Sequence, residues 1–567
     1  MNHSRWNLLP PAPDGYLDVA SGFPPLIAQL LYNRGLTEPS QLEAFITADG
    51  RLSGDPFLLP DMHRAVARIY QALLSGETIA IYGDFDADGI TATALLVQGL
   101  TTLGGRAIPY IPHRLTEGYG LKTVALESLY HQGVSLVVSV DCGITALDQV
   151  KKARRMGLDI IITDHHTPLP EIPSAVAIVD PKLPGSSYTF SELTGVGVAL
   201  KLIQAIFRSV GRKEQLDELS DLVALGTIAD MAPLLGENRY LVREGLKLIN
   251  ATPRLGIREM IAQAGLNSGS LDAESISWVI APRLNAAGRL AHAMTGYRLL
   301  MTDSPEEAHQ LAVELEQQNA ERQRLTTRVL AKAREQVLAQ GISPLLIARG
   351  KDYPVGITGL AAGRLTEEFY RPAIVIKSGE QVSSGSCRSI PEFNVIAALN
   401  RCSRLLDQFG GHSQAAGFTL PTKNLARFEE SLSQLAAAQL ADVDLRPRLD
   451  IDAEVALPSL GGETIRAIQQ LAPFGQGNPL PAFLSRGVGI ADCRTMGSKG
   501  EHLRMKLKQG GTLWDGVAFR LGDRLPEVSS PLDIVYNLGV DRWRGEERLR
   551  LNILDFSSPQ PALTTLT

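Results

Sequence analysis

Residues 78–89, TIAIYGDFDADG, are the stretch from which the fold of this chain can be worked out. The run TIAIY is short, apolar and rich in β-branched residues, which predicts a buried strand. Three aspartates then follow at alternate positions, Asp84, Asp86 and Asp88, and a helical pattern rich in Thr, Ala and Leu begins after Gly89. The carboxylates therefore lie where a strand ends and a helix begins. In open α/β sheets this is the usual place for a ligand.

A calcium-binding EF-hand loop is the first alternative, because its carboxylates alternate in the same way. That loop needs a bidentate Glu at its twelfth position and a helix in front of it. Here the twelfth position is Leu95, and a strand pattern precedes the loop. The stretch therefore matches only the first half of an EF-hand.

The composition describes an ordinary soluble protein of several domains. The chain has 567 residues, of which 44% are hydrophobic, and this length is too great for a single core. It contains no run of about 18 apolar residues, and its N-terminus lacks a basic segment followed by an apolar one. We therefore expect neither a membrane span nor a signal peptide, and a cytoplasmic location.

Cysteine usage and net charge exclude further classes of protein. The cysteines are scattered without CxxC spacing, which argues against a zinc knuckle and a disulfide framework. A formal net charge of −6 gives no global electrostatic footprint for nucleic acid, so any polyanion must be bound by local patches. The four cysteines are Cys142, Cys387, Cys402 and Cys493.

The pattern along the chain predicts an α/β protein of five segments. Between about Thr78 and Ile228 strands alternate with helices, which predicts a parallel sheet covered by helices on both faces. A second α/β pattern follows a long helix, and several short strand patterns after about Leu449 suggest a small OB-like β-barrel. The predicted segments are an N-terminal extension with one short helix over 25–32 (1–60), the first α/β domain (61–303), the connecting helix (304–341), the second α/β domain (342–446) and the barrel (447–567).

The connecting helix has a clear start signal. Ser304 is in place for the N-cap, Pro305 for the first helical position and Glu307 for the third. The helix should run to about Gln340, with apolar residues at both ends and a middle, 316–324, that is polar all round. A helix buried at both ends and solvated in the middle is typical of a bridge between domains, here over roughly 50 Å.

The barrel region carries a weak signal for single-strand binding. Between Arg486 and Arg550 there are 12 Lys or Arg against 9 Asp or Glu, together with Trp514, Tyr536 and Trp543. A basic groove with aromatic side chains is the usual platform for single-stranded nucleic acid. A solvated β surface with ordinary core aromatics explains the same composition equally well.

Three further stretches of the first α/β segment place acidic or imidazole groups after apolar runs. Asp141 follows SLVVSV, Asp164, His165 and His166 follow DIIIT, and Asp230 follows the apolar run of GTIADMAP. Taken singly, such an Asp is commonly a helix cap and such a His a structural one. Because strands of a parallel sheet end at the same edge, however, these groups and the first three aspartates should meet in one crevice.

Such a cluster of carboxylates predicts a pair of bound cations. Like charges at close range repel and raise one another's pKa, so the cluster cannot remain unpaired. The mixture of carboxylate with imidazole favours Mn²⁺, with Mg²⁺ as the alternative. Two such ions roughly 3.5 to 4 Å apart can activate water and stabilise an in-line displacement at phosphorus. The cluster therefore predicts phosphoester hydrolysis.

The same motifs resemble a known family. DFDADG, SVDCG, DHH and GTIAD match, in order, the signature of the DHH phosphoesterase superfamily, and the detail is closest to its RecJ family of bacterial 5′-to-3′ single-stranded-DNA exonucleases. The resemblance covers about residues 5–555 and implies that 61–303 is a DHH catalytic domain, 342–446 a DHHA1 substrate-binding domain and 447–567 an OB-like nucleic-acid-binding domain. The later matching motifs are PRLNAAGRL (282–290), SGSCRS (384–389), GGHSQAAGF (410–418) and PFGQGNP (473–479).

The resemblance also implies roles for single residues. His166 falls where an imidazole faces the scissile phosphate, and Asp164 orients a neighbouring His. The catalytic positions are Asp86, Asp88, His165 and His166. The metal-binding positions are Asp84, Asp86, Asp88, Asp141, His165 and Asp230.

Substrate contacts are implied outside the metal site. Ser386 and Arg388 could bind a terminal phosphate, since the planar guanidinium meets phosphate oxygens bidentately. His412 stands in a segment of small residues whose backbone N–H groups can approach a phosphate. Each could otherwise be an ordinary surface arginine or a buried His in a tight turn. The positions that resemble further contacts are Arg114, Asn285 and Arg289.

The expected function is degradation of single-stranded DNA to mononucleotides, 5′ to 3′, in recombinational and mismatch repair. The resemblance implies a single-strand-binding protein and a helicase as partners, and a monomer. One alternative is a DHH phosphoesterase for a small substrate such as a nanoRNA, a cyclic dinucleotide, a nucleotide bisphosphate or pyrophosphate. Such an enzyme has no evident need for the barrel. The other is a non-catalytic DNA-binding scaffold, against which the intact metal positions argue.

Overall fold

The computed structural model describes residues 3–212, 216–251, 254–543 and 546–559. The chain divides into two compact units. One comprises Ala48–Leu445 with Gly475–Gly477, and the other Met1–Thr47, Arg446–Phe474 and Asn478–Thr567. This division cuts through the predicted extension 1–60, and the five domain boundaries given above stay predictions.

The first unit contains a five-stranded sheet in which every neighbouring pair is parallel, as the sequence predicted. The strand order is β3-β2-β4-β5-β6. β3 therefore lies on one side of β2, and the next strand in sequence, β4, lies on the other side. The strands are β2 (Thr78–Tyr82), β3 (Arg106–Tyr110), β4 (Val134–Val140), β5 (Asp159–Thr163) and β6 (Ala177–Val179).

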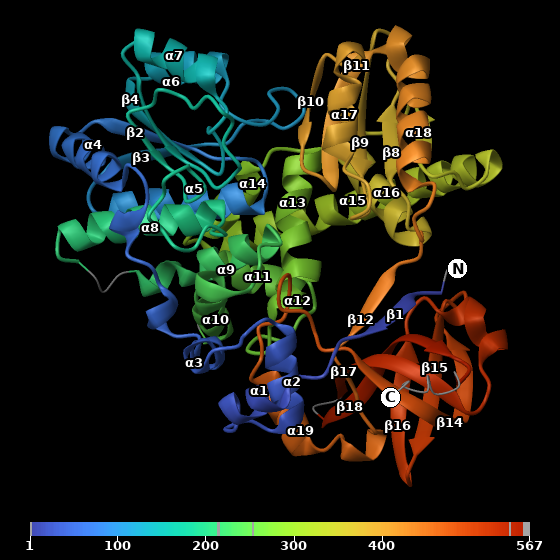
Figure 1. Ribbon diagram of the computed structural model, residues 1–567. Coiled ribbons are helices and arrows are strands. Elements are labelled where there is room, and N and C mark those ends of the chain that lie inside the picture. Colours follow the sequence, from blue (N-terminus) through green and yellow to red (C-terminus); the bar gives the residue numbers. More distant parts are fainter. Residues whose placement is uncertain (1–2, 213–215, 252–253, 544–545, 560–567) are drawn as a thin grey trace. The chain divides into compact units, whose positions relative to one another are not determined.

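Helices cover both faces of this sheet (Figure 1). Alternate side chains of β2 enter different cores: Ile79 and Ile81 pack against helices of one face, whereas Ala80 and Tyr82 pack against those of the other. This alternation follows from the period of two along a strand. The first face carries α4 (Met62–Ser75), α5 (Ala87–Thr102) and α8 (Gly195–Ser209), and the second carries α6 (Thr123–His131) and α7 (Leu147–Arg155).

The apolar run that precedes Asp230 is a helix, α9 (Ser220–Ala229), not a strand. The prediction that Asp230 follows a strand of the parallel sheet was therefore wrong. All residues from Asp221 to Thr227 are buried, and an all-round buried helix has no apolar periodicity that distinguishes it from a buried strand. The helices that follow are α10 (Gly236–Ala251), α11 (Leu255–Gln263), α12 (Ala273–Ser275), α13 (Ala281–Leu290) and α14 (Met294–Met301).

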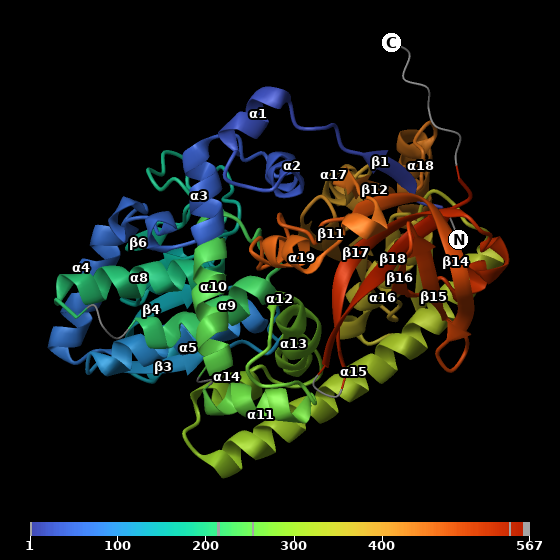
Figure 2. The same cartoon turned by 90° about the horizontal axis from the view of Figure 1, so that it is seen from below.

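The long helix α15 (Pro305–Gln340) begins and ends where the sequence pattern indicates. The Ser304 hydroxyl accepts the Glu307 N–H at 3.2 Å, as an N-cap should. Figure 2 shows the helix along its length. Its polar middle is less solvated than expected, because α13 packs against it: Glu316 pairs with Arg283 at 2.6 Å, and Asn319 is 1% exposed.

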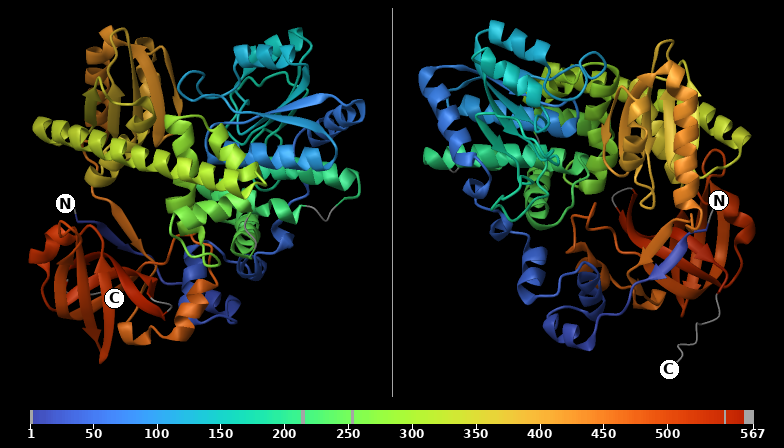
Figure 3. Two further views of the ribbon diagram at one scale, coloured as in Figure 1. Left: turned by 180° about the vertical axis from the view of Figure 1, so that it is seen from behind. Right: turned by 45° about the horizontal axis from the view of Figure 1, so that its top comes forward.

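A second, mixed sheet follows α15, with the strand order β10-β11-β9-β8-β7. Only β7 and β8 are parallel; the other pairs are antiparallel. Figure 3 shows α15 beside this sheet, and one of the sheet's two cores includes residues of α15. The elements are β7 (Leu346–Gly350), α16 (Val355–Phe369), β8 (Ala373–Lys377), β9 (Val382–Arg388), α17 (Val395–Arg401), β10 (Gln408–Gly411), β11 (Ala415–Pro421) and α18 (Leu425–Leu440).

The second unit contains the β-barrel that the sequence predicted. The strands pair in the order β14-β15-β16-β18-β17, and β14 also pairs with β17, which closes the barrel. The extension has more structure than the one helix expected, since α1 and α3 flank α2 and β1 pairs with β12. The elements are β1 (Arg5–Leu8), α1 (Asp14–Val19), α2 (Pro25–Asn33), α3 (Pro39–Thr47), β12 (Arg448–Ile451), β13 (Ala453–Glu454), α19 (Gly462–Gln469), β14 (Phe483–Met496), β15 (His502–Gln509), β16 (Thr512–Ala518), β17 (Leu532–Trp543) and β18 (Glu546–Ser557).

The barrel aromatics separate into different environments. Tyr536 is fully buried in the barrel, so it is a core residue and not a platform for bases. Trp514 is half-buried. The side chain of Trp543 lies outside the described residues. Among the helices described, none has the length and apolar character needed to cross a membrane.

Candidate metal and phosphate site

The candidate site lies at the carboxyl edge of the parallel sheet, where the strand order reverses between β2 and β4. The connections leave in opposite directions at such a point and open a crevice, which is where ligands bind in open α/β sheets. Asp84 follows β2, Asp141 follows β4, and Asp164, His165 and His166 follow β5. Because β2, β4 and β5 are neighbours in register, these side chains meet at one place.

The DFDADG turn is held by its own hydrogen bonds. Asp86 is the N-cap of α5, and its Oδ1 accepts the N–H groups of Asp88 at 3.0 Å and Gly89 at 3.1 Å. A Cβ at Gly89 would lie 2.6 Å from the backbone of Asp84, so only glycine allows this close turn. The turn therefore fixes the direction of three carboxylates.

Asn285 of α13 holds the same turn from outside. Its Oδ1 accepts the N–H of Ala87 at 2.8 Å. The structure therefore gives Asn285 a bond to the backbone of the metal loop, whereas its predicted contact with substrate stays a prediction.

Asp88 is held by the N-terminus of α8. Its two oxygens accept the N–H groups of Gly195 at 2.7 Å and Val196 at 2.8 Å. The side chain is 1% exposed. A helix N-terminus stabilises a negative charge, so this contact orients the carboxylate and partly offsets its burial.

Asp141 and His165 form the centre of the cluster. Asp141 has a φ of 59°, a left-handed conformation that Asp tolerates better than most residues. His165 Nε2 lies 3.0 Å from Asp141 Oδ1, 3.9 Å from Asp88 Oδ2 and 4.0 Å from Asp230 Oδ2. Burial and the charge of His166 lower the pKa of His165 to about 3, so its imidazole is neutral and can act as a metal ligand.

Asp164 fixes the backbone of the turn after β5 and orients the imidazole of His166. Its carboxylate is fully buried and accepts the N–H groups of Ile144, His165 and His166. It also lies 2.7 Å from His166 Nδ1. Burial alone would raise the pKa of Asp164, but the hydrogen bond and charge of His166 outweigh burial and lower it. Asp164 therefore stays ionised.

His166 differs from His165 in its protonation state. Burial lowers its pKa, but the hydrogen bond and charge of Asp164 outweigh this and raise it to about 9. The hydroxyl of Tyr119 lies 3.3 Å from His166 Nδ1 and donates to the carbonyl of Asp141 at 3.2 Å. His166 is thus fixed as a hydrogen-bond donor at the edge of the cluster.

These residues fit a pair of divalent cations. The ligand atoms of each of three groups lie within 4.8 Å of one another. Asp84 Oδ1 is buried without a hydrogen-bond partner in the described structure, as expected of a metal ligand. The three groups are Asp84, Asp86 and Asp141; Asp88, His165 and Asp230; and Asp141, His165 and His166.

The buried carboxylates should make the stability of the metal-free protein depend on pH. Burial, followed by neighbouring negative charges, raises the pKa of Asp88 and Asp141 well above its usual value. The folded protein therefore holds protons that the unfolded chain has released above about pH 4. Consequently the free energy of unfolding should fall as pH rises from there through the raised pKa values, and Mn²⁺ should remove this loss.

Calorimetric melting temperatures between about pH 5 and pH 8, in EDTA and in MnCl₂, measure this effect. The matched control is the double variant Asp88→Asn, Asp141→Asn, whose amides do not ionise. In EDTA its melting temperature should decline less with pH than that of the wild type. Equal slopes for both proteins would contradict the assignment of these raised pKa values.

The contact of Asp164 with His166 gives a second prediction. Asp164→Asn should lower kcat/KM by at least about tenfold, because loss of a partner that orients a metal-site His typically costs 10 to 100-fold. The expected pH profile also changes, since an amide no longer raises the pKa of His166. Steady-state rates over a range of pH provide the measurement, and an unchanged profile would count against this role.

Three arginines gather beside the acidic cluster. The Arg114 guanidinium lies 4.6 Å from the centre of the Phe85 ring, Arg289 donates to the carbonyl of Gly356 at 3.2 Å, and Arg388 to that of Cys387 at 2.8 Å. In the described structure none of the three forms an ion pair. Burial, then the charges of Arg114, Arg322 and Arg388, lowers the pKa of Arg289 to about 9. This site therefore favours an anion.

The second sheet supplies the remaining predicted residues. The Ser386 hydroxyl lies 2.9 Å from that of Thr358, in the first turn of α16, and Ser386 lies on β9 close to Arg388. His412 lies between β10 and β11, where it is exposed. Its ring is parallel to that of His166, with centres 6.4 Å apart. The alternative of a buried His in a turn is therefore wrong for His412.

Four residues near the site were not singled out by sequence reasoning. Tyr119 lies five residues after Arg114, the one residue of that stretch that was singled out, and Arg322 lies in the segment assigned to a solvated bridge. Asp180 follows β6 as Asp164 follows β5, so the same strand-end signal could have identified it. Lys182, two residues later, carried no sequence signal.

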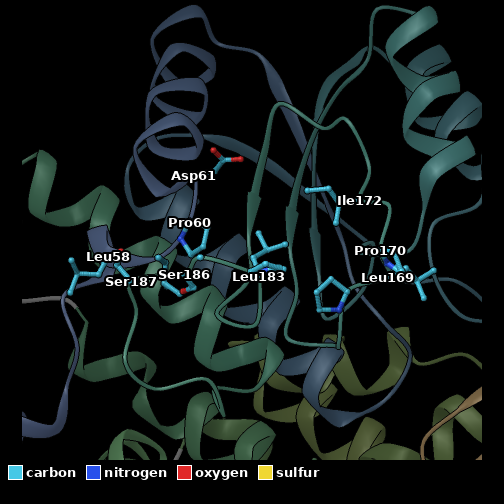
Figure 4. A pocket seen from close by; sticks show the side chains of 13 residues that line it. Leu58, Pro60, Asp61, Leu169, Pro170, Ile172, Leu183, Ser186 and Ser187 are labelled. Atoms are coloured by element: carbon cyan, nitrogen blue, oxygen red, sulfur yellow. The ribbon is translucent and has the colours of Figure 1, made fainter.

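A large hollow in this unit lies apart from the predicted site. It has a volume of about 790 Å³ and is lined mainly by leucine, isoleucine and proline (Figure 4). None of the predicted metal or substrate residues lines it. Its walls are Leu58–Asp61, Pro168–Pro170, Ile172 and Leu183–Ser187.

Family models match three regions of the chain. The DHH family N-terminal domain matches residues 78–227, the DHHA1 domain matches 339–438, and the RecJ OB domain matches 451–555. All residues proposed above as metal ligands except Asp230 fall within the first match.

Curated relatives and solved structures match over most of the chain. The single-stranded-DNA-specific exonuclease RecJ of Bacillus subtilis is 37% identical over 558 residues, which are 97% of this chain and 70% of that protein. The protein of the same name from Thermus thermophilus is 35% identical over 510 residues, 88% of this chain and 72% of that protein. The crystal structure of RecJ in complex with Mn²⁺ from the same organism has a TM-score of 0.85 at 31% identity, and the match covers 99% of this chain and 80% of that one. The corresponding complex with Mg²⁺ has a TM-score of 0.79.

Proposed function

Because the chain belongs to the RecJ family of single-stranded-DNA-specific exonucleases, we propose that it hydrolyses single-stranded DNA from the 5′ end to mononucleotides, with two divalent cations as cofactors. The single observation that carries this proposal is the meeting of carboxylates and imidazoles beside three arginines that form no ion pair with any residue the structure describes. A cation pair suits phosphoester hydrolysis, and an adjacent anion site suits a terminal phosphate.

The metal ligands would be Asp84, Asp86, Asp88, Asp141, His165 and Asp230. When bound, the two cations supply Lewis-acid stabilisation of charge on the phosphoryl oxygens and a more acidic water, with Mn²⁺ preferred and Mg²⁺ accepted. The chain's own residues orient these side chains: the N-terminus of α8 holds Asp88, and Asp164 accepts the backbone N–H of His165 and contacts the imidazole of His166.

The remaining residues would position the nucleic acid. Arg289 and Arg388, with Arg114, would hold the 5′-terminal phosphate, and Ser386 lies within reach of the same anion. His166, kept protonated by Asp164, would donate a hydrogen bond to an oxygen of the scissile phosphate. His412 faces His166 across the site and would contact the same strand.

Digestion of labelled oligonucleotides tests this function. With Mn²⁺ or Mg²⁺, the purified protein should release labelled mononucleotides from a 5′-labelled single strand at once. A 3′-labelled strand should instead give progressively shorter labelled products. A blunt duplex of the same sequence serves as the control and should be resistant. Release from the 3′ end first, or equal digestion of the duplex, would contradict the proposal.

The cellular setting rests on the family alone. We include in the proposal a role in recombinational and mismatch repair, a cytoplasmic location, a monomeric state, and a single-strand-binding protein and a helicase as partners. We also include binding of single-stranded DNA by the barrel, whose half-buried Trp514 and local basic excess support it.

A further inference from the structure

Lys182 is a cation to which no role has been assigned. It lies at the other end of the metal edge from Arg114. Lys182 lies in the turn that leaves β6, the edge strand next to β5, at the same carboxyl edge as the DHH residues. It is half-buried, and its ammonium forms no ion pair with any residue the structure describes. An unpaired cation beside a group of carboxylates needs an explanation, because such charges usually pair when they are withdrawn from water.

Asp180 fixes this turn. Its Oδ1 accepts the backbone N–H of Lys182 at 2.8 Å, and its side chain is fully buried. Its Oδ2 is buried without a hydrogen-bond partner in the described structure. A short Asx turn held by a buried carboxylate has little freedom, so the starting direction of the Lys182 side chain is set by the fold.

The charge of Lys182 acts on one side of the site. Burial is the main cause that lowers the pKa of His412, and the charges of His166 and Lys182 lower it further. Because β6 pairs with β5, the turn that carries Lys182 lies next to the turn that carries His165 and His166.

The arginines act on the other side. The charge of Arg114 acts on Asp84, and the charge of Asp86 acts on Arg289. In the strand order β3-β2-β4-β5-β6, Arg114 follows β3 and Lys182 follows β6. The metal carboxylates that follow β2 and β4 therefore lie between these two cations along the edge of the sheet. A single strand that places one phosphate at the arginines and the next at the metals will bring a third phosphate toward Lys182.

We propose that Lys182 forms a binding site for the phosphate that follows the scissile one on its 3′ side. This inference rests on the proposed function, since it assumes a 5′ phosphate at the arginines. Lys182 then makes the affinity depend on the length of the substrate. A strand that ends at the nucleotide after the scissile bond has no phosphate for Lys182 to bind, whereas any longer strand has one.

Two short substrates separate this role from a general loss of activity. The 5′-phosphorylated dinucleotide pTpT carries a terminal and a scissile phosphate, and pTpTpT adds one phosphate beyond. Lys182→Ala should lower kcat/KM for the first cleavage of pTpTpT by about tenfold, the size expected for one charged hydrogen bond, mainly through KM. It should leave pTpT unchanged, and Lys182→Arg should recover most of the loss.

A neutral linkage supplies the matched substrate control. With a methylphosphonate at the second linkage of pTpTpT, wild type and Lys182→Ala should have equal kcat/KM. On a longer strand, the slope of log kcat/KM against log salt should become shallower by about 0.7 in the variant, as for one lost phosphate contact. Lys151→Ala, which removes an exposed lysine of α7, serves as the control variant and should behave as wild type.

The outcomes distinguish a failure of the proposed function from a failure of the phosphate site at Lys182. If wild type does not release mononucleotides from the longer strand, the proposed function is wrong and the phosphate site falls with it. If wild type digests the longer strand and Lys182→Ala has the same salt slope, the proposed function stands and the phosphate site is wrong. If wild type cleaves both short substrates and Lys182→Ala slows them equally, or slows neither, the proposed function stands and the phosphate site is wrong.

Discussion

His165→Ala should lower kcat/KM on 5′-phosphorylated single-stranded DNA by about a thousandfold or more. His165 Nε2 lies 3.0 Å from Asp141 and 3.9 Å from Asp88. His165 belongs to two of the three sets of candidate metal ligands, so its loss removes a neutral ligand from both sets. Metal ions contribute several kcal/mol of charge stabilisation in such reactions, and each 1.36 kcal/mol corresponds to a tenfold change in rate. Steady-state digestion of a labelled oligonucleotide with Mn²⁺ measures the effect.

The control for this substitution is His131→Ala, which removes an exposed imidazole from the end of α6. It should retain wild-type activity. Asp86→Ala should resemble His165→Ala, because Asp86 both caps α5 and belongs to a candidate ligand group. A rate within tenfold of wild type for either His165→Ala or Asp86→Ala would contradict the metal assignment.

Arg388→Ala should raise KM for 5′-phosphorylated ends by about a hundredfold while changing kcat little. Arg388 forms no ion pair among the described residues, and its guanidinium lies near Arg114 and Arg289, so it is free to bind a phosphate oxygen pair. A charged hydrogen bond contributes about 1.5 to 3 kcal/mol, and a bidentate contact has two. Kinetics on one sequence with a 5′ phosphate and with a 5′ hydroxyl measure the difference.

Two variants sharpen the test of Arg388. Arg388→Lys keeps the charge without the planar fork and should have an intermediate KM. Arg349→Ala removes an exposed arginine of β7 that pairs with Glu429, and should not alter the preference for phosphorylated ends. If Arg388→Ala affects phosphorylated and hydroxyl ends equally, its assignment to the terminal phosphate is wrong.

The parallel sheet and its metal edge could be predicted from sequence because both depend on local patterns. Runs such as SLVVSV and DIIIT are typical of buried parallel strands, and strand direction alone brings Asp141 and His165 together. The ends of α15 were predictable for the same reason, since Ser304, Pro305 and Glu307 encode a helix start within four residues.

The remaining features depend on contacts that no local pattern contains. Asp230 reaches the cluster from a helix, and a buried helix has the same apolar run as a buried strand. Asn319 is buried because α13 packs against it, although its neighbours in sequence are polar. Lys182 lies in a turn held by Asp180, which a single sequence does not reveal.

The most direct test of the central claim is Mn²⁺ anomalous scattering from crystals of the protein grown with MnCl₂. We predict two peaks roughly 3.5 to 4 Å apart. They should lie between the carboxylates that follow β2 and β4, His165 and Asp230. A map without peaks at these residues, or with Mn²⁺ bound elsewhere in the chain, would contradict the proposal that these side chains form a two-metal phosphoesterase site.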